Sequence, residues 1–132
     1  MRPILTILIF LLLPQPLHAK TVFREGKASW YSSREACGPK TNPLANCPTA
    51  SGHSIFKLES QGVRFAAMWN MPFGTRIKVT NRKNGRSVII IVLDRGPNKR
   101  LHSRSIDLCK RAFQDIADHR TGILQVKLEV LP

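Results

Sequence analysis

The sequence has few acidic residues for its length. Its 132 residues include 8 Asp and Glu against 21 Lys and Arg, a formal net charge of +13 at pH 7. Such an excess of positive charge favours polyanionic surroundings, such as nucleic acid, anionic lipid or an anionic wall polymer. Because the basic residues are scattered along the chain as well as clustered at 99–100, a general contribution to solubility remains an alternative.

Cysteine is also scarce. Cys37 and Cys47 bracket a Pro- and Asn-rich loop without periodicity, and we predict a disulfide between them that contributes at most about 2–3 kcal/mol. The odd count then leaves Cys109 unpaired, either as a catalytic thiol or, as we favour, as a small buried side chain. With no Cys-x-x-Cys and no close His pair, the sequence predicts neither a metal site nor a cofactor.

No apolar run is long enough to cross a membrane. Residues 4–13 form a short apolar run after Arg2, and a small residue, Ala19, stands at a plausible cleavage point. We therefore predict a signal peptide at 1–19 rather than a buried N-terminal element, and an exported mature chain, periplasmic or extracellular. No Cys follows the cleavage point, so no lipid anchor is predicted.

The remaining chain shows no repeat, no Gly/Ser linker and no second apolar core. Its length suits one small domain, residues 20–132, and we expect a monomer. Export argues against nucleic acid as the natural partner, and no stable membrane span is expected once the signal peptide is removed.

The strongest structural signal in the sequence is a predicted hairpin at 72–97. Asn84-Gly85 predicts a type I′ turn with positive φ at both residues. The strand before it alternates apolar and polar residues, whereas 88–93 is an unbroken apolar run, typical of a strand covered on both faces. This strand delivers Asp94 into the turn Arg95-Gly96-Pro97, where we expect chemistry.

The other elements are shorter. We predict strands at 26–31, 64–69 and 124–130, and a turn at 49–53. One helix is predicted at about 108–118, with Asp107 as its N-cap. Five or six strands and one helix indicate a small barrel.

Several motifs occur in a familiar order. They are Gly-Lys-Ala-Ser-Trp-Tyr at 26–31, Thr-Ala-Ser-Gly at 49–52, Ala-Ala-x-x-x-x-Pro-Phe-Gly-Thr at 66–75, Asn-Gly at 84–85, Asp-Arg-Gly-Pro at 94–97 and Ile-Asp-Leu at 106–108. From 26 to 131 the chain resembles the rare lipoprotein A family. The resemblance implies a mainly β fold, a six-stranded double-psi β-barrel with one short α-helix, and a lytic transglycosylase that cuts the glycan strands of peptidoglycan in the cell envelope.

Asp94 matches the family's catalytic aspartate. A glycoside hydrolase generally needs two carboxyl groups. In a lytic transglycosylase the sugar's own 6-hydroxyl attacks and forms a 1,6-anhydro product, so one carboxyl group can act as acid and base. Desolvation beside 88–93 could supply the raised pKa that this role needs. The alternative is a structural carboxylate that caps the following turn.

The chain departs from the family pattern at two positions. His53 occupies the position of the family's functional glutamate, and Met68 occupies the position of its groove histidine. If the alignment is shifted by several residues, Glu59 takes the place of the glutamate. His53 is then either a sugar-binding side chain or an exposed turn histidine. These departures leave a second hypothesis open, a non-catalytic, expansin-like module that binds peptidoglycan.

Three further residues are predicted to bind substrate. Trp69 lies at a strand end where a sugar ring could stack, Arg95 adjoins the catalytic candidate, and Asp107 lies in the Ile-Asp-Leu motif. For Trp30 we favour packing in the core over sugar stacking. A third reading, a secreted defence protein or inhibitor of barwin type, is disfavoured because three cysteines are too few for its disulfide framework.

Overall fold

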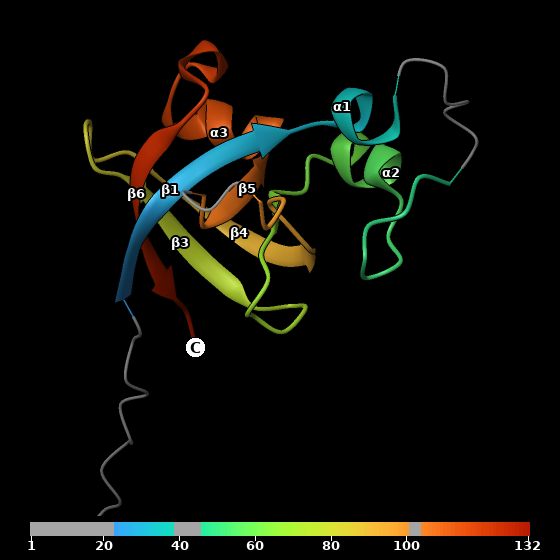
Figure 1. Cartoon of the computed structure of the whole chain (residues 1–132), viewed down its shortest axis with the longest axis horizontal. Coiled ribbons are helices and arrows are strands. Elements are labelled where there is room, and N and C mark those ends of the chain that lie inside the picture. The colour runs from blue at the N-terminus through green and yellow to red at the C-terminus, as the bar shows by residue number, and fades with distance from the viewer. Residues whose placement is uncertain (1–22, 39–45, 101–103) are drawn as a thin grey trace, which may run out of the picture.

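A computed structural model describes residues 23–38, 46–100 and 104–132, so the predicted signal peptide lies outside the described residues. Six strands close into a barrel in the order β1-β5-β2-β4-β3-β6 (Figure 1). They are β1 Phe23–Tyr31, β2 Phe65–Ala67, β3 Arg76–Asn81, β4 Ser87–Asp94, β5 Ile106–Cys109 and β6 Leu124–Val130. The six-stranded double-psi barrel predicted from the sequence is confirmed.

Two of the strand pairs are parallel, β1 with β5 and β2 with β4, and the other four are antiparallel. The chain entering β5 passes close to β1, where the Ser105 amide donates to the Lys27 carbonyl at 2.8 Å. A Cβ at Gly26 would lie 2.3 Å from Ser105 Oγ, so only glycine permits this approach.

The barrel core is built from alternate residues of the strands. Ile77 and Val79 of β3 are fully buried, and Val126 of β6 lies in the same core. Polar residues occupy the intervening positions, which is the period expected of half-buried strands. The alternation predicted for these two strands is confirmed.

The part of the chain that the structure describes contains three short α-helices rather than one. They are α1 Ser33–Cys37, α2 Ile55–Ser60 and α3 Lys110–Ile116, and a 3-10 turn, η1 His119–Thr121, follows α3. Helices α1 and α2 lie together at one side of the barrel (Figure 1). Each has five or six residues, too few for a helical period to appear in the sequence.

Asp107 is not a helix N-cap, so that prediction is wrong. It lies within β5, and Cys109 takes the N-cap position of α3. Ile106 and Leu108 on either side of it are fully buried, which is a period of two rather than of a helix. Pairing of β5 with both β1 and β2 holds this segment extended.

Burial of β4 on both faces is also wrong for its first half. Ile89 is 48% exposed, whereas Ile90 and Val92 are buried. A barrel strand turns only one face to the interior, and the opposite face is covered only where another element packs on it. Only the second half of β4, which ends at Asp94, is well covered.

The hairpin forms, but not with a type I′ turn. Gly85 has φ 75°, and no non-glycine residue among those described has positive φ, so Asn84 does not meet the type I′ requirement. The Gly85 amide donates to the Asn81 carbonyl at 2.8 Å, and the Asn81 amide donates to the Arg86 carbonyl at 2.8 Å. The connection is thus a four-residue loop in which only glycine needs the left-handed region.

Candidate functional site

Four side chains form a row across neighbouring strands. Ser29 of β1 pairs with Asp107 of β5, Asp107 with Ala67 of β2, and Ala67 with Asp94 of β4. Directly paired residues project from the same face of a sheet. Because neighbouring strands lie about 4.8 Å apart, the Cα atoms of Asp94 and Asp107 are roughly 10 Å apart across Ala67. The barrel therefore presents two carboxyl groups on one face.

A cleft of about 280 Å³ lies over this row and is lined by both aspartates. The turn after β4 forms one wall, where Gly96 passes over Ala67. A Cβ on Gly96 would lie 3.2 Å from the Ala67 Cβ, and the φ of Gly96 is 156°. Glycine at 96 and alanine at 67 together keep the cleft free of side-chain atoms between the two carboxyl groups.

Asp94 is half-buried and accepts three hydrogen bonds. The Tyr31 hydroxyl donates to Oδ2 at 2.9 Å, and the Ala50 and Arg95 amides donate to Oδ1 at 2.8 and 2.9 Å. Three donors stabilise a carboxylate in one orientation. The bond from the Arg95 amide is the turn cap considered above, yet Asp94 also lines the cleft.

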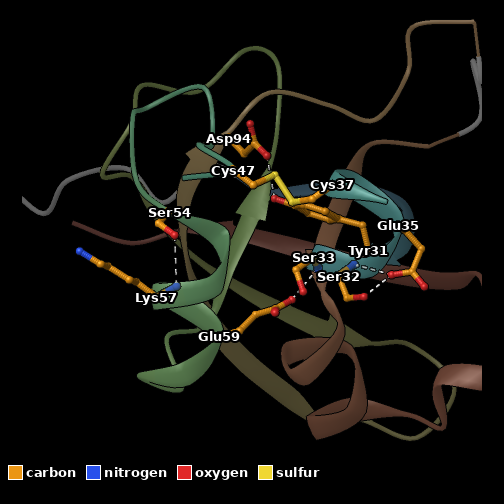
Figure 2. The surroundings of a disulfide bond; sticks show 10 residues. All are labelled: Tyr31, Ser32, Ser33, Glu35, Cys37, Cys47, Ser54, Lys57, Glu59 and Asp94. Carbon is orange, nitrogen blue, oxygen red and sulfur yellow. Dashed lines mark hydrogen bonds between the residues drawn. A yellow bond between two sulfur atoms is a disulfide. The ribbon is translucent and has the colours of Figure 1, made fainter. Parts of the chain in front are cut away.

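Tyr31 is the buried side chain that donates a hydrogen bond to Asp94. The residue is 9% exposed, and its ring packs edge-on against Phe65, with ring centroids 5.9 Å apart. Burial is the main cause of the raised pKa of Tyr31, and the charge of Asp94 is the next. The phenol therefore stays protonated and acts as a hydrogen-bond donor to Asp94. Figure 2 shows this hydrogen bond beside the disulfide.

Asp107 occupies a different environment. Burial raises its pKa from 3.8 to about 6, and the nearby charge of Asp94 acts in the same direction. The Ser29 hydroxyl, which donates to Oδ1 at 3.1 Å, and the charge of Arg104 oppose the shift. Asp107 is therefore the carboxyl group in the cleft that holds a proton to mildly acidic pH.

Glu35 is a cleft residue that the sequence analysis missed. It lies in α1, and the amide and hydroxyl of Ser32 both donate to its Oε2 (Figure 2). The Ser32 hydroxyl is the main cause of its lowered pKa, so Glu35 brings a negative charge to the cleft. The Ser-x-x-Glu spacing could have indicated a capping box and a helix start, but not that this helix borders Asp94.

Arg95 lines the cleft but its guanidinium is engaged elsewhere. Nη1 donates to the carbonyls of Met68 and Met71, each at 2.9 Å, and the guanidinium lies 3.8 Å from the centroid of the Phe73 ring. These contacts fix the loop between β2 and β3. Arg95 thus lines the cleft as part of the turn after β4, while its guanidinium group holds a neighbouring loop rather than projecting free donors into the cleft.

The residues at the departures from the family pattern lie outside the cleft lining. His53 is exposed, with Nδ1 2.8 Å from Ser51 Oγ, and its turn contributes to the site through the Ala50 amide on Asp94. Met68 is buried and has no group that titrates. Glu59 accepts a hydrogen bond from the Ser33 amide at 2.7 Å and lines a different cavity.

The two tryptophans have different environments. Trp30 packs against the core and its Nε1 donates to the His119 carbonyl at 2.8 Å. Trp69 is 41% exposed, and its Nε1 donates to the carbonyl of Pro97, a residue of the cleft wall, at 2.6 Å. Trp69 therefore stands next to the cleft with much of its ring in solvent.

The predicted disulfide is confirmed, with Cα atoms of Cys37 and Cys47 6.1 Å apart. It joins the end of α1 to the chain that leads into the 49–53 turn (Figure 2). One partner thus follows Glu35 and the other precedes Ala50, so the bond ties two borders of the cleft together. Cys109 is free and buried, as expected of a small core residue, and burial raises the pKa of its thiol.

Metal ligands do not gather anywhere in residues 23–38, 46–100 and 104–132, since no group of three or more His, Cys, Asp or Glu side chains there could hold a metal ion. No helix in those ranges has both the length and the apolar character to cross a membrane.

A family model described as "Lytic transglycolase" matches residues 24–128. "Endolytic peptidoglycan transglycosylase RlpA" of Rickettsia felis is 34% identical over 118 residues, which cover 89% of this chain and 46% of that protein. "Probable endolytic peptidoglycan transglycosylase RlpA" of Nostoc sp. is 38% identical over 107 residues, 81% of this chain and 25% of that protein. The chain thus spans less than half the length of these curated relatives.

Among solved structures, a mutant of the Clavibacter michiganensis expansin in complex with cellohexaose has a TM-score of 0.56 and 20% sequence identity. The match covers 84% of this chain and 51% of that one. At this identity the likeness shows a shared fold.

Proposed function

The chain belongs to the lytic transglycolase family, and from this premise we propose that it cleaves peptidoglycan glycan strands to 1,6-anhydro products after export to the wall. The observation that carries the proposal is the pair of carboxyl groups, Asp94 and Asp107, on one face of the barrel in a cleft. Asp94 is the catalytic residue expected from the sequence, and Asp107 is its partner.

The proposed step moves one proton in and one proton out. The 6-hydroxyl of the muramic acid sugar attacks its own C1, the C1–O6 bond forms and the bond from C1 to the bridging oxygen breaks. Asp107 gives its proton to the leaving oxygen, and Asp94 takes the proton of the attacking hydroxyl. The products are a 1,6-anhydro end and a new 4-hydroxyl end, and exchange with solvent returns both carboxyl groups to their starting states.

The environments of the two carboxyl groups support this division of roles. A pKa of about 6 at Asp107 suits a proton donor. The three hydrogen bonds to Asp94 fix the orientation of its carboxyl group in the cleft, as the position of a proton acceptor requires. The negative charge of Glu35 in the same cleft would stabilise positive charge at C1 in the transition state. The sequence alone had suggested that Asp94 performs both proton transfers.

The test is digestion of purified peptidoglycan, with products identified by mass spectrometry. We expect 1,6-anhydro ends from the wild-type protein and background levels from Asp94→Asn. Glu129→Gln, a carboxylate of β6 outside the cleft lining, is the matched control and should keep full activity. Wild-type product no higher than that of Asp94→Asn would refute the proposal.

The alternative is a non-catalytic wall-binding module of expansin type. It is favoured by His53 lying outside the cleft lining and by Met68 in place of a titratable residue, together with the basic charge of the chain. It predicts salt-sensitive sedimentation with peptidoglycan that Asp94→Asn does not change, without anhydro products. Absence of binding to peptidoglycan would remove it.

A further inference from the structure

A second cavity of about 340 Å³ lies beside the catalytic cleft, where β2 ends and β5 begins. Trp69, Asn70 and Arg104 line it from the two loops, and Arg24 lines it from β1. The lining combines an aromatic ring, a side-chain amide and two guanidinium groups, which are groups able to bind an acidic sugar.

No carboxylate among the described residues that line this cavity pairs with its two arginines. The guanidinium groups of Arg24 and Arg104 make no hydrogen bond or ion pair with another described residue, so their donors are available to a ligand. The one carboxylate in the lining, Glu25, pairs with Arg82 at 3.2 Å. Lys99 adds a third positive charge, with Nζ 4.5 Å from the centroid of the Trp69 ring.

Trp69 is held in place before any ligand arrives. Its hydrogen bond to the Pro97 carbonyl fixes one edge of the indole, and 41% of the residue stays exposed. A fixed aromatic ring stacks on the C–H face of a sugar at little entropic cost. Guanidinium groups beside it can bind a carboxylate with paired hydrogen bonds.

The second cavity adjoins the catalytic cleft through the chain itself. Trp69 follows Ala67 by two residues, and its partner Pro97 lines the cleft. Arg104 is close enough for its charge to act on Asp107. A glycan strand that binds over the two aspartates and continues past Pro97 would place its neighbouring sugar against Trp69.

We infer that Trp69, Arg24 and Arg104 form a subsite for a carboxylate-bearing sugar next to the cleaved bond. The inference rests on the proposed function for the identity of the glycan. In peptidoglycan the carboxylate has two sources, the lactyl group of a peptide-free muramic acid and the peptide that is otherwise attached to it. Both offer the same chemistry to the two arginines.

The test measures binding in an Asp94→Asn background, so that the strands stay intact. Arg24→Gln is the informative variant, because Arg104 also affects Asp107, and Arg86→Gln on the hairpin loop is the matched control. Four ligands are compared: peptide-free strands, peptide-bearing strands, peptide-free strands with amidated carboxyl groups, and a neutral chitin oligosaccharide. Circular dichroism and the melting temperature confirm that both variants fold.

We expect Arg24→Gln to weaken binding about tenfold for carboxylate-bearing strands and to leave amidated strands and chitin unchanged. Weakening confined to peptide-free strands identifies the lactyl group, and weakening confined to peptide-bearing strands identifies the peptide. Trp69→Leu should weaken binding of all four ligands. Equal binding by Arg24→Gln and Arg86→Gln, or equal weakening on amidated strands and chitin, would overturn the inference.

Failure of this inference is distinguishable from failure of the proposed function. The binding assay needs no turnover, so a charge-dependent loss of affinity would stand even if no anhydro product formed. Conversely, anhydro products with no effect of Arg24→Gln would leave the proposed reaction intact and remove only the subsite.

Discussion

The end of β4 and the start of β5 each place an aspartate on the same face of the barrel, but the two aspartates have different environments. Asp94 receives donors from a buried phenol and two backbone amides, whereas Asp107 receives one hydroxyl and is raised in pKa by burial. The difference arises from the turns: the 49–53 turn and the turn after β4 deliver amides to Asp94, and among the described residues no amide reaches Asp107 in the same way. In the proposed reaction, backbone amides of the described residues are present at Asp94 and missing at Asp107. This difference, rather than the residue type, distinguishes the proton acceptor from the proton donor.

The largest expected effect comes from removing the acceptor. Asp94→Asn keeps the size of the side chain and should lower the rate of anhydro product formation about 10²- to 10⁴-fold, because the 6-hydroxyl proton loses its acceptor. Affinity for glycan strands should change little. Initial rates from product mass spectrometry measure this, and a loss below tenfold would mean that Asp94 only caps its turn.

Removing the donor should have the next largest effect and a distinct pH signature. The wild-type rate should fall as pH rises through about 6, because Asp107 must be protonated to act. Asp107→Asn should lower the rate about 10- to 100-fold at pH 5 and abolish that dependence. A falling limb near pH 6 that persists in Asp107→Asn would assign the proton donor to another group.

Tyr31→Phe removes one of the three donors to Asp94 without removing the ring. We expect a fall in kcat of about tenfold with KM nearly unchanged, since Asp94 loses part of its orientation. Steady-state kinetics measure the two constants separately. A rise in KM alone would place Tyr31 in substrate binding instead.

The smallest effect concerns stability. The raised pKa of Asp107 means that the folded state binds its proton more tightly than the unfolded state, so this contribution is complete below pH 3.8 and is lost as pH rises through about 6. Asp107→Asn does not titrate at this position. The free energy of unfolding of the variant minus that of wild type should therefore be about 2–3 kcal/mol larger at pH 8 than at pH 4. Urea denaturation at the two pH values tests this.

An equal difference between variant and wild type at both pH values would contradict the assigned environment of Asp107. The same experiment with Asp94→Asn sharpens the contrast between the two residues. Asp94→Asn should destabilise the protein because the amide nitrogen cannot accept from its donors.

Local periodicity was enough to predict the strands that alternate over six or more residues. The Pro- and Asn-rich loop without periodicity between Cys37 and Cys47 was enough to predict their disulfide. Strand β5 was not predicted, because four residues next to a helix are too few to show a period of two clearly. Asp94 was predicted as a catalytic candidate because it ends an apolar run and matches the catalytic aspartate of the family that the sequence resembles. The partners that define its chemistry, Tyr31 and Ala50, come from 63 and 44 residues away, a relation that only the barrel register creates.

Glu35 and the subsite at Trp69 illustrate the same limit. Glu35 lies in the cleft because a five-residue helix and a disulfide position it. Neither feature, read from the sequence, indicates which part of the barrel the side chain faces. Arg24 and Arg104 are 80 positions apart and meet because β1 and β5 are neighbours in a closed barrel. Scattered basic residues in the sequence therefore concealed a local cluster.

The most direct measurement of the central claim is digestion of glycan strands in water enriched in heavy oxygen. Attack by the sugar's own 6-hydroxyl predicts anhydro ends that carry no label, formed by the wild-type protein and lost in Asp94→Asn. Labelled reducing ends would show that water is the nucleophile and that the two carboxyl groups perform hydrolysis, which would contradict the account.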